Sequence, residues 1–295
     1  MLFPGGSRAG DNTPSGKMGH SIALARQENA FDPSQMAPKI AGNWICWHIE
    51  PKAVEKLMKV SDKLGDLYGD YYDLGGSLAQ KRKVTARQTI GHIKTLLPDP
   101  PYGRLLDIGA GEGSVLEELD IAAFAEELHA VEISLSGIET IKRRNIPRVK
   151  SVSQFDGYKI DVPDKTYDLG TAIHVLEHVE HERAFIEEIT RACEIVYIEV
   201  PLELTARVDR SIELSGPFGH INFYNPSTLR NLLKTCNVEI LAFQVFPHSR
   251  AYETHVAGNF VGNIKYGLRS SLLAFIPGAA TFAMSYLAGA VCRRS

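Results

Sequence analysis

The order of apolar and polar positions between residues 104 and 260 alternates between short apolar runs and amphipathic stretches. The apolar runs predict buried strands, and the stretches between them, with apolar residues every three to four positions, predict helices. Seven strands are predicted, beginning at residues 104, 128, 149, 167, 195, 238 and 251. Such alternation favours an α/β fold with a mostly parallel sheet and helices on both faces.

The ends of the chain have a different pattern, which divides the sequence into four predicted parts. Residues 1–40 are rich in Gly, Pro, Ser and Asn without a sustained period, which predicts a loose N-terminal arm. Residues 41–100 predict a helical cap or lid segment. Residues 101–265 are the predicted main domain, and residues 266–295 form an apolar C-terminal segment.

The C-terminal segment has no charged residue from Leu272 to Cys292, and Arg269 precedes this run while Arg293 and Arg294 follow it. A helix of that length would reach about 30 Å, which is enough to cross a hydrocarbon core. Its Pro, Gly, Ser, Thr and Ala residues make it less hydrophobic than a typical span. The alternatives are contact with a membrane surface, a lid over an apolar substrate channel, and packing on the core. Because the predicted sheet is complete by residue 260, we expect the segment to be buried outside the sheet.

The clearest chemical signal lies at residues 104–113, with the sequence RLLDIGAGEG. A buried strand leads into three glycines at alternate positions, and a helical pattern follows. Gly109, Gly111 and Gly113 allow a sharp turn and a close approach of the backbone to a ligand. The N–H groups at the start of the helix would face that ligand. Glu132 ends the next strand, close to the roughly 20-residue offset at which a carboxylate meets ribose hydroxyls. A β-α-β unit without a ligand is the alternative.

The spacing D-x-G-x-G-x-G, from Asp107 to Gly113, resembles motif I of the class I S-adenosylmethionine (SAM) methyltransferases. A nicotinamide site would have G-x-G-x-x-G, and this chain has Ser114 where the third glycine would stand. The resemblance covers roughly residues 68–260 and extends to ubiquinone- and menaquinone-type enzymes. It implies a Rossmann-like fold, SAM as the cofactor and a small-molecule acceptor. The cofactor-binding residues that it implies are Asp107, Gly109, Gly111, Gly113, Glu132, Ile133, Asp156, Gly157 and His174.

Two further segments resemble parts of this family. Asp156 and Gly157 match the position whose carboxylate accepts a hydrogen bond from the adenine amine, and a turn residue in Asp-Gly is the alternative. An aromatic loop before residue 81 matches a segment that covers SAM, with Tyr72 and Arg82 as lid candidates. A loop that only seals the core is the alternative there.

The run from His174 to His178, HVLEH, permits three interpretations. H-x-x-E-H is a zinc-protease pattern, and His181 offers a further nitrogen. The run also matches the h-x-L-E-H segment of quinone-type methyltransferases, at a strand end that borders the ligand crevice. A structural histidine is the third interpretation. We predict that no metal is bound. If the acceptor is a hydroxyl, a base is needed, and His178 and His220 are the candidates.

Composition narrows these alternatives. The chain has 295 residues, and its net charge of −3 gives no electrostatic case for nucleic acid as a partner. Its four cysteines have no C-x-x-C spacing and the N-terminus has no secretion signal, so a reducing cytoplasmic compartment is predicted, with membrane association through the tail left open. The predicted function is SAM-dependent methylation, with O-methylation of a small hydrophobic acceptor favoured. A non-catalytic SAM-fold subunit and an NAD(P)-dependent oxidoreductase are the alternatives.

Overall fold

The computed structural model describes residues 36–41, 44–49, 77–97 and 100–295, and it divides into two units, residues 1–53 and 54–295. In the first unit, β1 (Met36–Ala41) and β2 (Trp44–Ile49) pair antiparallel. The sequence analysis had predicted an irregular arm and the start of a helical segment here, and both predictions are wrong for these residues. The β-branched and aromatic side chains of Trp44–Ile49 favour a strand. The predicted helix after residue 51 and the lid candidate Tyr72 lie outside the described residues.

A seven-stranded sheet forms the centre of the second unit, in the order β5-β4-β3-β6-β7-β9-β8. All pairings among β3 to β7 are parallel, whereas β9 runs antiparallel to both of its neighbours. This order confirms the predicted Rossmann-like, mostly parallel sheet. The strands are β3 (Tyr102–Ile108), β4 (Ala125–Glu132), β5 (Val149–Gln154), β6 (Tyr167–Ile173), β7 (Cys193–Leu202), β8 (Val238–Phe246) and β9 (Tyr286–Arg294).

The seventh strand is not the predicted one. Residues 250–257 instead form α9 (Arg250–Ala257), which Ser249 caps by accepting a hydrogen bond from the Tyr252 N–H, and a second helix begins at residue 259. The missing strand is β9, which lies between β7 and β8 although it comes from the segment expected to pack outside the sheet. Gly289 fits there because a Cβ at its position would lie 2.7 Å from the Tyr197 hydroxyl. The predicted domain end at residue 265 therefore leaves out a strand of the sheet.

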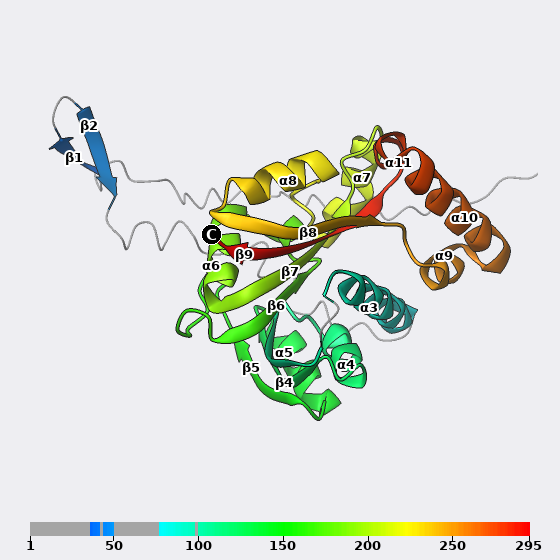
Figure 1. Cartoon of the computed structure of the whole chain (residues 1–295), viewed down its shortest axis with the longest axis horizontal. Helices are drawn as coiled ribbons and strands as arrows, with labels where there is room; N and C mark the ends of the chain where they lie inside the picture. Colours follow the sequence, from blue (N-terminus) through cyan, green and yellow to red (C-terminus); the bar gives the residue numbers. More distant parts are fainter. Residues whose placement is uncertain (1–35, 42–43, 50–76, 98–99) are drawn as a thin grey trace, which may run out of the picture. The chain divides into compact units, whose positions relative to one another are not determined.

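Helices cover both faces of the sheet (Figure 1). Buried apolar side chains between the sheet and its helices form two clusters. One includes residues of α3, α4 and α5, and the other includes residues of α6 and α8. The bounds are α3 (Ser77–Leu96), α4 (Ser114–Ile121), α5 (Leu135–Arg144), α6 (Glu182–Ala192) and α8 (Pro226–Lys234). Asn225 caps α8, since its side chain accepts hydrogen bonds from the N–H groups of Ser227 and Thr228.

Two insertions form what we call the cap from here on, which is a different part of the chain from the cap or lid segment predicted at residues 41–100. The first, between β7 and α8, contains α7 (Val208–Ser215) and η4 (Gly216–Phe218). The second, between β8 and β9, contains α9, α10 (Asn259–Phe275) and α11 (Pro277–Ala283), and Figure 1 shows both at the same end of the sheet. Within the described part of the chain, no helix has the length and apolar character needed to cross a membrane.

Candidate functional site

A cavity of about 870 Å³ lies at the carboxyl ends of β3, β4, β6 and β7. Open α/β sheets bind ligands at this edge, because the loops that follow the strands meet there. The glycine turn after β3 lines one side of the cavity, and cap residues such as Leu214 and Tyr252 line the other. The structure therefore brings two chemically different surfaces to one space.

The glycine turn has the backbone geometry that the sequence analysis expected. Gly109, Gly111 and Gly113 have φ angles of 70°, 57° and 85°, in the left-handed region that favours glycine. The Glu132 carboxylate holds the turn, since it accepts hydrogen bonds from the N–H groups of Gly111 (2.7 Å) and Ser134 (2.9 Å). Burial raises the pKa of Glu132 above its ordinary value. Turn and carboxylate thus form one unit beside Ile133, which also lines the cavity.

Asp107 is the last but one residue of β3 and lines the cavity, and it is 2% exposed. Its Oδ1 accepts a hydrogen bond from the Thr171 hydroxyl at 2.7 Å. Its Oδ2 is buried and has no hydrogen-bond partner among the described residues. Burial and the nearby charge of Glu132 raise the pKa of Asp107 to about 7, although the Thr171 hydrogen bond opposes the shift. A buried carboxylate with one unsatisfied oxygen fits a ligand that brings a cationic donor.

Asp156 occupies a different position from the other predicted cofactor residues. Its side chain is exposed, and Oδ1 accepts hydrogen bonds from the N–H groups of Tyr158 (2.9 Å) and Lys159 (2.7 Å). These are the contacts of an Asx turn, the alternative that the sequence had left open. Gly157 lines the cavity, whereas Asp156 is outside its lining. Contact between Asp156 and adenine stays a prediction.

His174 follows β6 and lies between two buried glutamates. Its Nδ1 is 3.2 Å from Oε1 of Glu177, and its Nε2 is 3.6 Å from Oε1 of Glu199. Burial opposes a charge on this ring, but the hydrogen bond to Glu177 and the negative charges of Glu177 and Glu199 raise the pKa of His174 to about 10. The same contacts hold the pKa of Glu199 well below its usual range against the effect of burial. His174 thus joins two buried carboxylates at the wall of the cavity.

Glu199, which the sequence analysis did not select, connects this wall to α3. It is 0% exposed, and it accepts hydrogen bonds from the Thr89 hydroxyl (2.8 Å) and His92 Nδ1 (2.9 Å). The Tyr197 hydroxyl donates a further hydrogen bond to it. The available signal was a glutamate within the apolar run at residues 195–200, because such a charge must be paired when it is buried.

The two predicted base candidates lie together. The rings of His178, from η3 (Leu176–His178), and His220, from the loop after η4, meet edge to face with centroids 4.8 Å apart. His178 donates from Nδ1 to the Gly219 carbonyl oxygen at 2.9 Å, and burial lowers its pKa. His220 donates from Nδ1 to Oε2 of Glu203 at 2.8 Å. In a neutral ring held this way, Nε2 is the atom that accepts a proton.

Glu203 is the second residue that the sequence analysis missed. It accepts hydrogen bonds from both His220 and the Ser215 hydroxyl (2.8 Å), so it orients the imidazole. A histidine oriented by a carboxylate is the usual arrangement of a general base. The signal was its place just after β7, four residues beyond Glu199, but its partner lies 17 residues away in an irregular loop.

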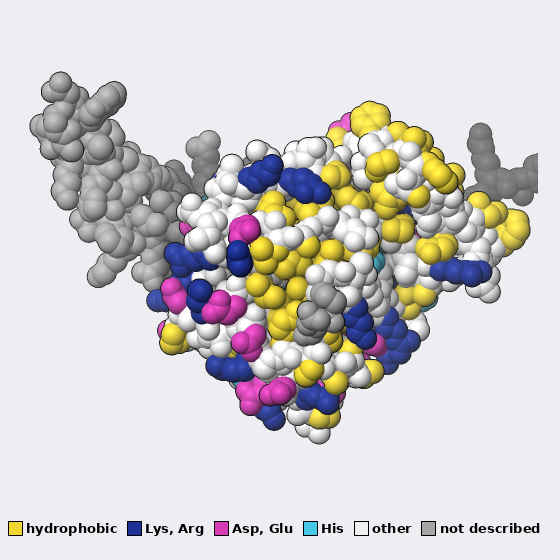
Figure 2. Space-filling view, in the orientation of Figure 1, with side chains coloured by type: hydrophobic (Ala, Val, Ile, Leu, Met, Phe, Trp, Pro, Cys, Tyr) yellow, Lys and Arg dark blue, Asp and Glu magenta, His cyan; other side chains and the backbone are white. Residues whose placement is uncertain are grey.

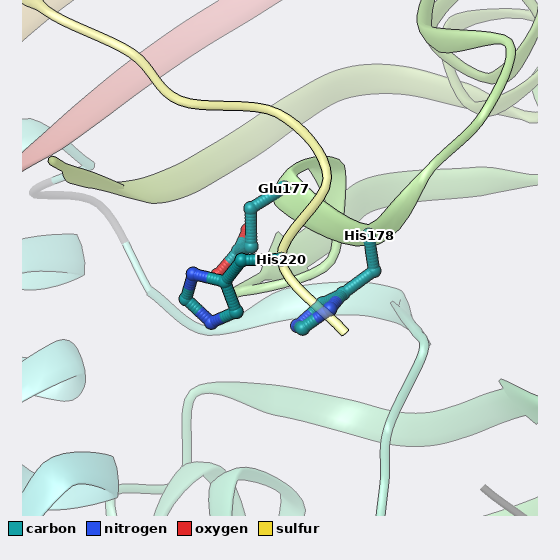
Figure 3. Close-up of side chains that lie close together, drawn as sticks. All are labelled: Glu177, His178 and His220. Carbon is teal, nitrogen blue, oxygen red and sulfur yellow. The ribbon is translucent and has the colours of Figure 1, made fainter. Parts of the chain in front are cut away.

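Glu177, His178 and His220 also offer potential metal ligands, with one atom from each lying within 4.8 Å of the others. Figure 3 shows the three side chains close together, with Glu177 and His178 coming from η3 and His220 from the loop after η4. Bonds of about 2.1 Å to one zinc ion place tetrahedral ligand atoms roughly 3.4 Å apart, so the side chains would have to move closer to hold it. His181 lies outside this group. The absence of metal stays a prediction.

Comparison with known proteins identifies the family. Residues 78–242, more than half of the chain, match the family model described as a methyltransferase domain. The chain belongs to this family. The methyltransferase assignment agrees with the resemblance seen at Asp107 to Gly113. A search of the curated proteins found no match.

Solved structures agree with the fold of this methyltransferase. A chain of the Haloferax volcanii complex that contains the Trm112 methyltransferase activator has a TM-score of 0.55 at 12% identity, covering 80% of this chain and 100% of that one. Geranyl diphosphate methyltransferase in complex with SAM has a TM-score of 0.53 at 14% identity, with 71% and 85% covered. The [4+2]-cyclase SpnF has a TM-score of 0.51 at 18% identity, with 71% and 80% covered. At these identities the likeness shows the fold alone.

Proposed function

We propose that this methyltransferase transfers the methyl group of SAM to a hydroxyl group of a small hydrophobic acceptor, with His220 as the general base. The observation that supports this most is the single cavity shared by the glycine turn and the His220–Glu203 pair. Transfer needs the cofactor's methyl and the acceptor's nucleophile in one enclosed space, and orientation alone is worth roughly 7–11 kcal/mol.

The glycine-turn side would hold the cofactor. The unsatisfied Oδ2 of Asp107 suits the ammonium group of the SAM amino-acid portion, and the left-handed backbone at Gly109 and Gly111 lets that portion approach closely. Glu132 and Ile133 would contact the ribose, and Gly157 the adenine. SAM supplies the electrophilic methyl on its sulfonium. His174, whose pKa is raised, would hold Glu177 and Glu199 in place at the cavity wall between the cofactor and the acceptor.

His220 would remove the proton from the acceptor hydroxyl. Glu203 fixes the ring and stabilises the imidazolium that forms when Nε2 takes the proton. His178 lies against His220, and its lowered pKa keeps a second positive charge away from that imidazolium. We assign His178 to positioning the acceptor, with proton transfer left to His220.

The lining of the acceptor side favours a hydrophobic molecule. Leu214 and Phe218 of the first insertion line this side of the cavity, together with Val256 of the second insertion. Tyr252 and Tyr286 add aromatic surface. A pocket with apolar walls and a few polar groups binds apolar ligands and orients them through those groups.

The test is incubation of the full chain with SAM labelled at the methyl group and two metabolite extracts, one apolar and one polar. Intact-mass detection of labelled product is expected in the apolar extract, on an oxygen atom. Product only in the polar extract would contradict the acceptor class, and N-methylation would contradict the base assignment. SAM binding without product from either extract would favour a non-catalytic subunit, and NAD(P) binding without SAM binding would favour the oxidoreductase.

A further inference from the structure

Helix α10 presents an apolar stripe to solvent. Phe260, Ile264, Leu268 and Phe275 are 79%, 56%, 49% and 84% exposed. At 3.6 residues per turn, these four positions fall within an arc of about 80° on one face of the helix. A surface helix normally has polar residues on its outer face, so this arrangement points to a partner that covers it.

The opposite face of α10 is packed against the rest of the cap, so the helix cannot rotate to bury the stripe. A Cβ at Gly262 would lie 2.5 Å from the backbone of Glu253 in α9, so only glycine allows this close approach. Arg269 forms an ion pair with Glu253 at 3.0 Å, with side chains 15% and 5% exposed. Tyr286 of β9 donates a hydrogen bond to the Arg269 carbonyl oxygen at 3.1 Å. The orientation of the stripe is thus fixed by the fold.

The apolar surface continues beyond α10. Ile276, just before α11, is 50% exposed, and Phe282, within α11, is 67% exposed. Figure 2 shows hydrophobic side chains along this end of the molecule. Leu214 of α7 and Val256 of α9 are 60% and 55% exposed, and both also line the cavity. The exposed surface therefore reaches the acceptor side of the site.

The charges on α10 and directly beside it are basic. The sequence contains no Asp or Glu after Glu253, whereas the exposed Lys265 lies on α10 beside the stripe. The exposed Arg250 lies next to α10, because its guanidinium donates a hydrogen bond to the Asn263 side chain. An apolar face edged by basic residues is typical of helices that lie flat in the interface of an anionic bilayer.

We propose that the stripe of α10 and the adjoining part of α11 dock this protein onto an anionic lipid surface. A second copy of the chain suits the stripe less well, because an interface with two-fold symmetry on α10 would bring the basic residues of both copies together, and α10 itself has no acidic residue to pair with them. A docked cap would place the mouth of the cavity at the bilayer, so that a hydrophobic acceptor enters directly from lipid. That last clause rests on the proposed function, whereas the docking itself does not.

The test is co-sedimentation of the full chain with vesicles of phosphatidylcholine alone, or of phosphatidylcholine and phosphatidylglycerol in equal parts. The variant to compare combines F260S, F275S and F282S. A matched control combines I121S and L135S, since Ile121 and Leu135 are 66% and 61% exposed, outside the cap and the cavity lining. We expect wild type and control to bind the anionic vesicles, and the triple variant to lose at least about tenfold in partitioning.

A charge variant tests the choice of lipid. K265E should weaken binding to the anionic vesicles severalfold and leave binding to phosphatidylcholine unchanged. Equal sedimentation of wild type and triple variant, or no sedimentation of wild type, would overturn the proposal. A wild-type dimer that becomes monomeric in the triple variant, without vesicle binding, would assign the surface to a second copy. Titration of each variant with SAM is expected to match wild type, so a failure of docking is separable from a failure of the proposed function.

Discussion

The two sides of the cavity are built in opposite ways. The glycine-turn side comes from one continuous β-α-β unit, in which Glu132 at the end of β4 holds Gly111 after β3 through a backbone hydrogen bond. The acceptor side is assembled from loops and helices inserted after β7 and β8, and its His220–Glu203 pair joins two of these elements. The difference teaches that the geometry of the glycine-turn side is set by neighbouring residues of one unit. The geometry of the acceptor side depends on how separate insertions pack together.

The largest expected effect tests the acceptor side. H220A removes the proposed base, so we expect kcat to fall by roughly 10²–10⁴ while SAM affinity stays unchanged. Steady-state kinetics with the identified acceptor and titration calorimetry with SAM measure the two quantities. H255A is the matched control, because His255 is exposed on α9 and outside the cavity lining. Unchanged turnover in H220A would remove its role as base.

The corresponding change on the cofactor side is G111V. Gly111 has a φ of 57°, which a β-branched residue adopts only at a cost of about 1–3 kcal/mol, and the new side chain would enter the cofactor space. We expect SAM affinity to fall about a hundredfold by calorimetry. G91A in α3 should bind SAM normally, because nothing lies within 4 Å of a Cβ at that position. Normal SAM binding by G111V would contradict the assignment of the turn.

A smaller effect is expected from E132A. The substitution removes the proposed acceptor of ribose hydroxyls and leaves the N–H groups of Gly111 and Ser134 without their carboxylate partner. A hydrogen bond to a charged group contributes about 1.5–3 kcal/mol, so SAM should bind roughly ten to a hundred times more weakly. If calorimetry gave the wild-type affinity, the ribose would have to lie elsewhere.

The pH dependence of SAM binding examines Asp107. Its pKa is raised to about 7 by burial, so the carboxyl is increasingly neutral below pH 7 and ionised above it. The ionised form attracts the SAM ammonium, and therefore affinity should fall as the pH drops, by up to about tenfold per unit below the pKa. Calorimetry in buffers of different ionisation enthalpy should detect proton release near pH 7. D107N should bind weakly and without this pH dependence, and a flat wild-type profile would contradict the ammonium contact.

The smallest expected effect is that of a chelator. Although Glu177, His178 and His220 lie close together, we expect no stoichiometric metal by elemental analysis and unchanged turnover after treatment with EDTA. Zinc retained by wild type and lost in H178A would contradict this expectation. A metal ion on the acceptor side would then polarise the hydroxyl. The two sides of the cavity would differ in their chemistry as well as in how they are built.

Local features of the sequence were enough to predict the glycine turn and most of the sheet. The glycines after β3 and the acid at the end of β4 stand at fixed spacing, so their geometry follows from neighbouring residues. Strand β9 was not predicted, because an uncharged run of small residues has no period that separates a strand from a helix. Glu203 was missed for a related reason: its role depends on His220, which only the folded loops bring within reach.

The position of β9 has a consequence for folding during synthesis. β7 is made well before β9, which pairs with it, and the whole second insertion must be translated in between. Until β9 arrives, β7 and β8 each present an open strand edge, and such edges are templates for aggregation. Closing this long excursion also costs chain entropy before any pairing is gained, which predicts slow, chaperone-sensitive maturation. Substitutions that weaken β9 should therefore lower the yield of folded protein more than they lower its activity per molecule.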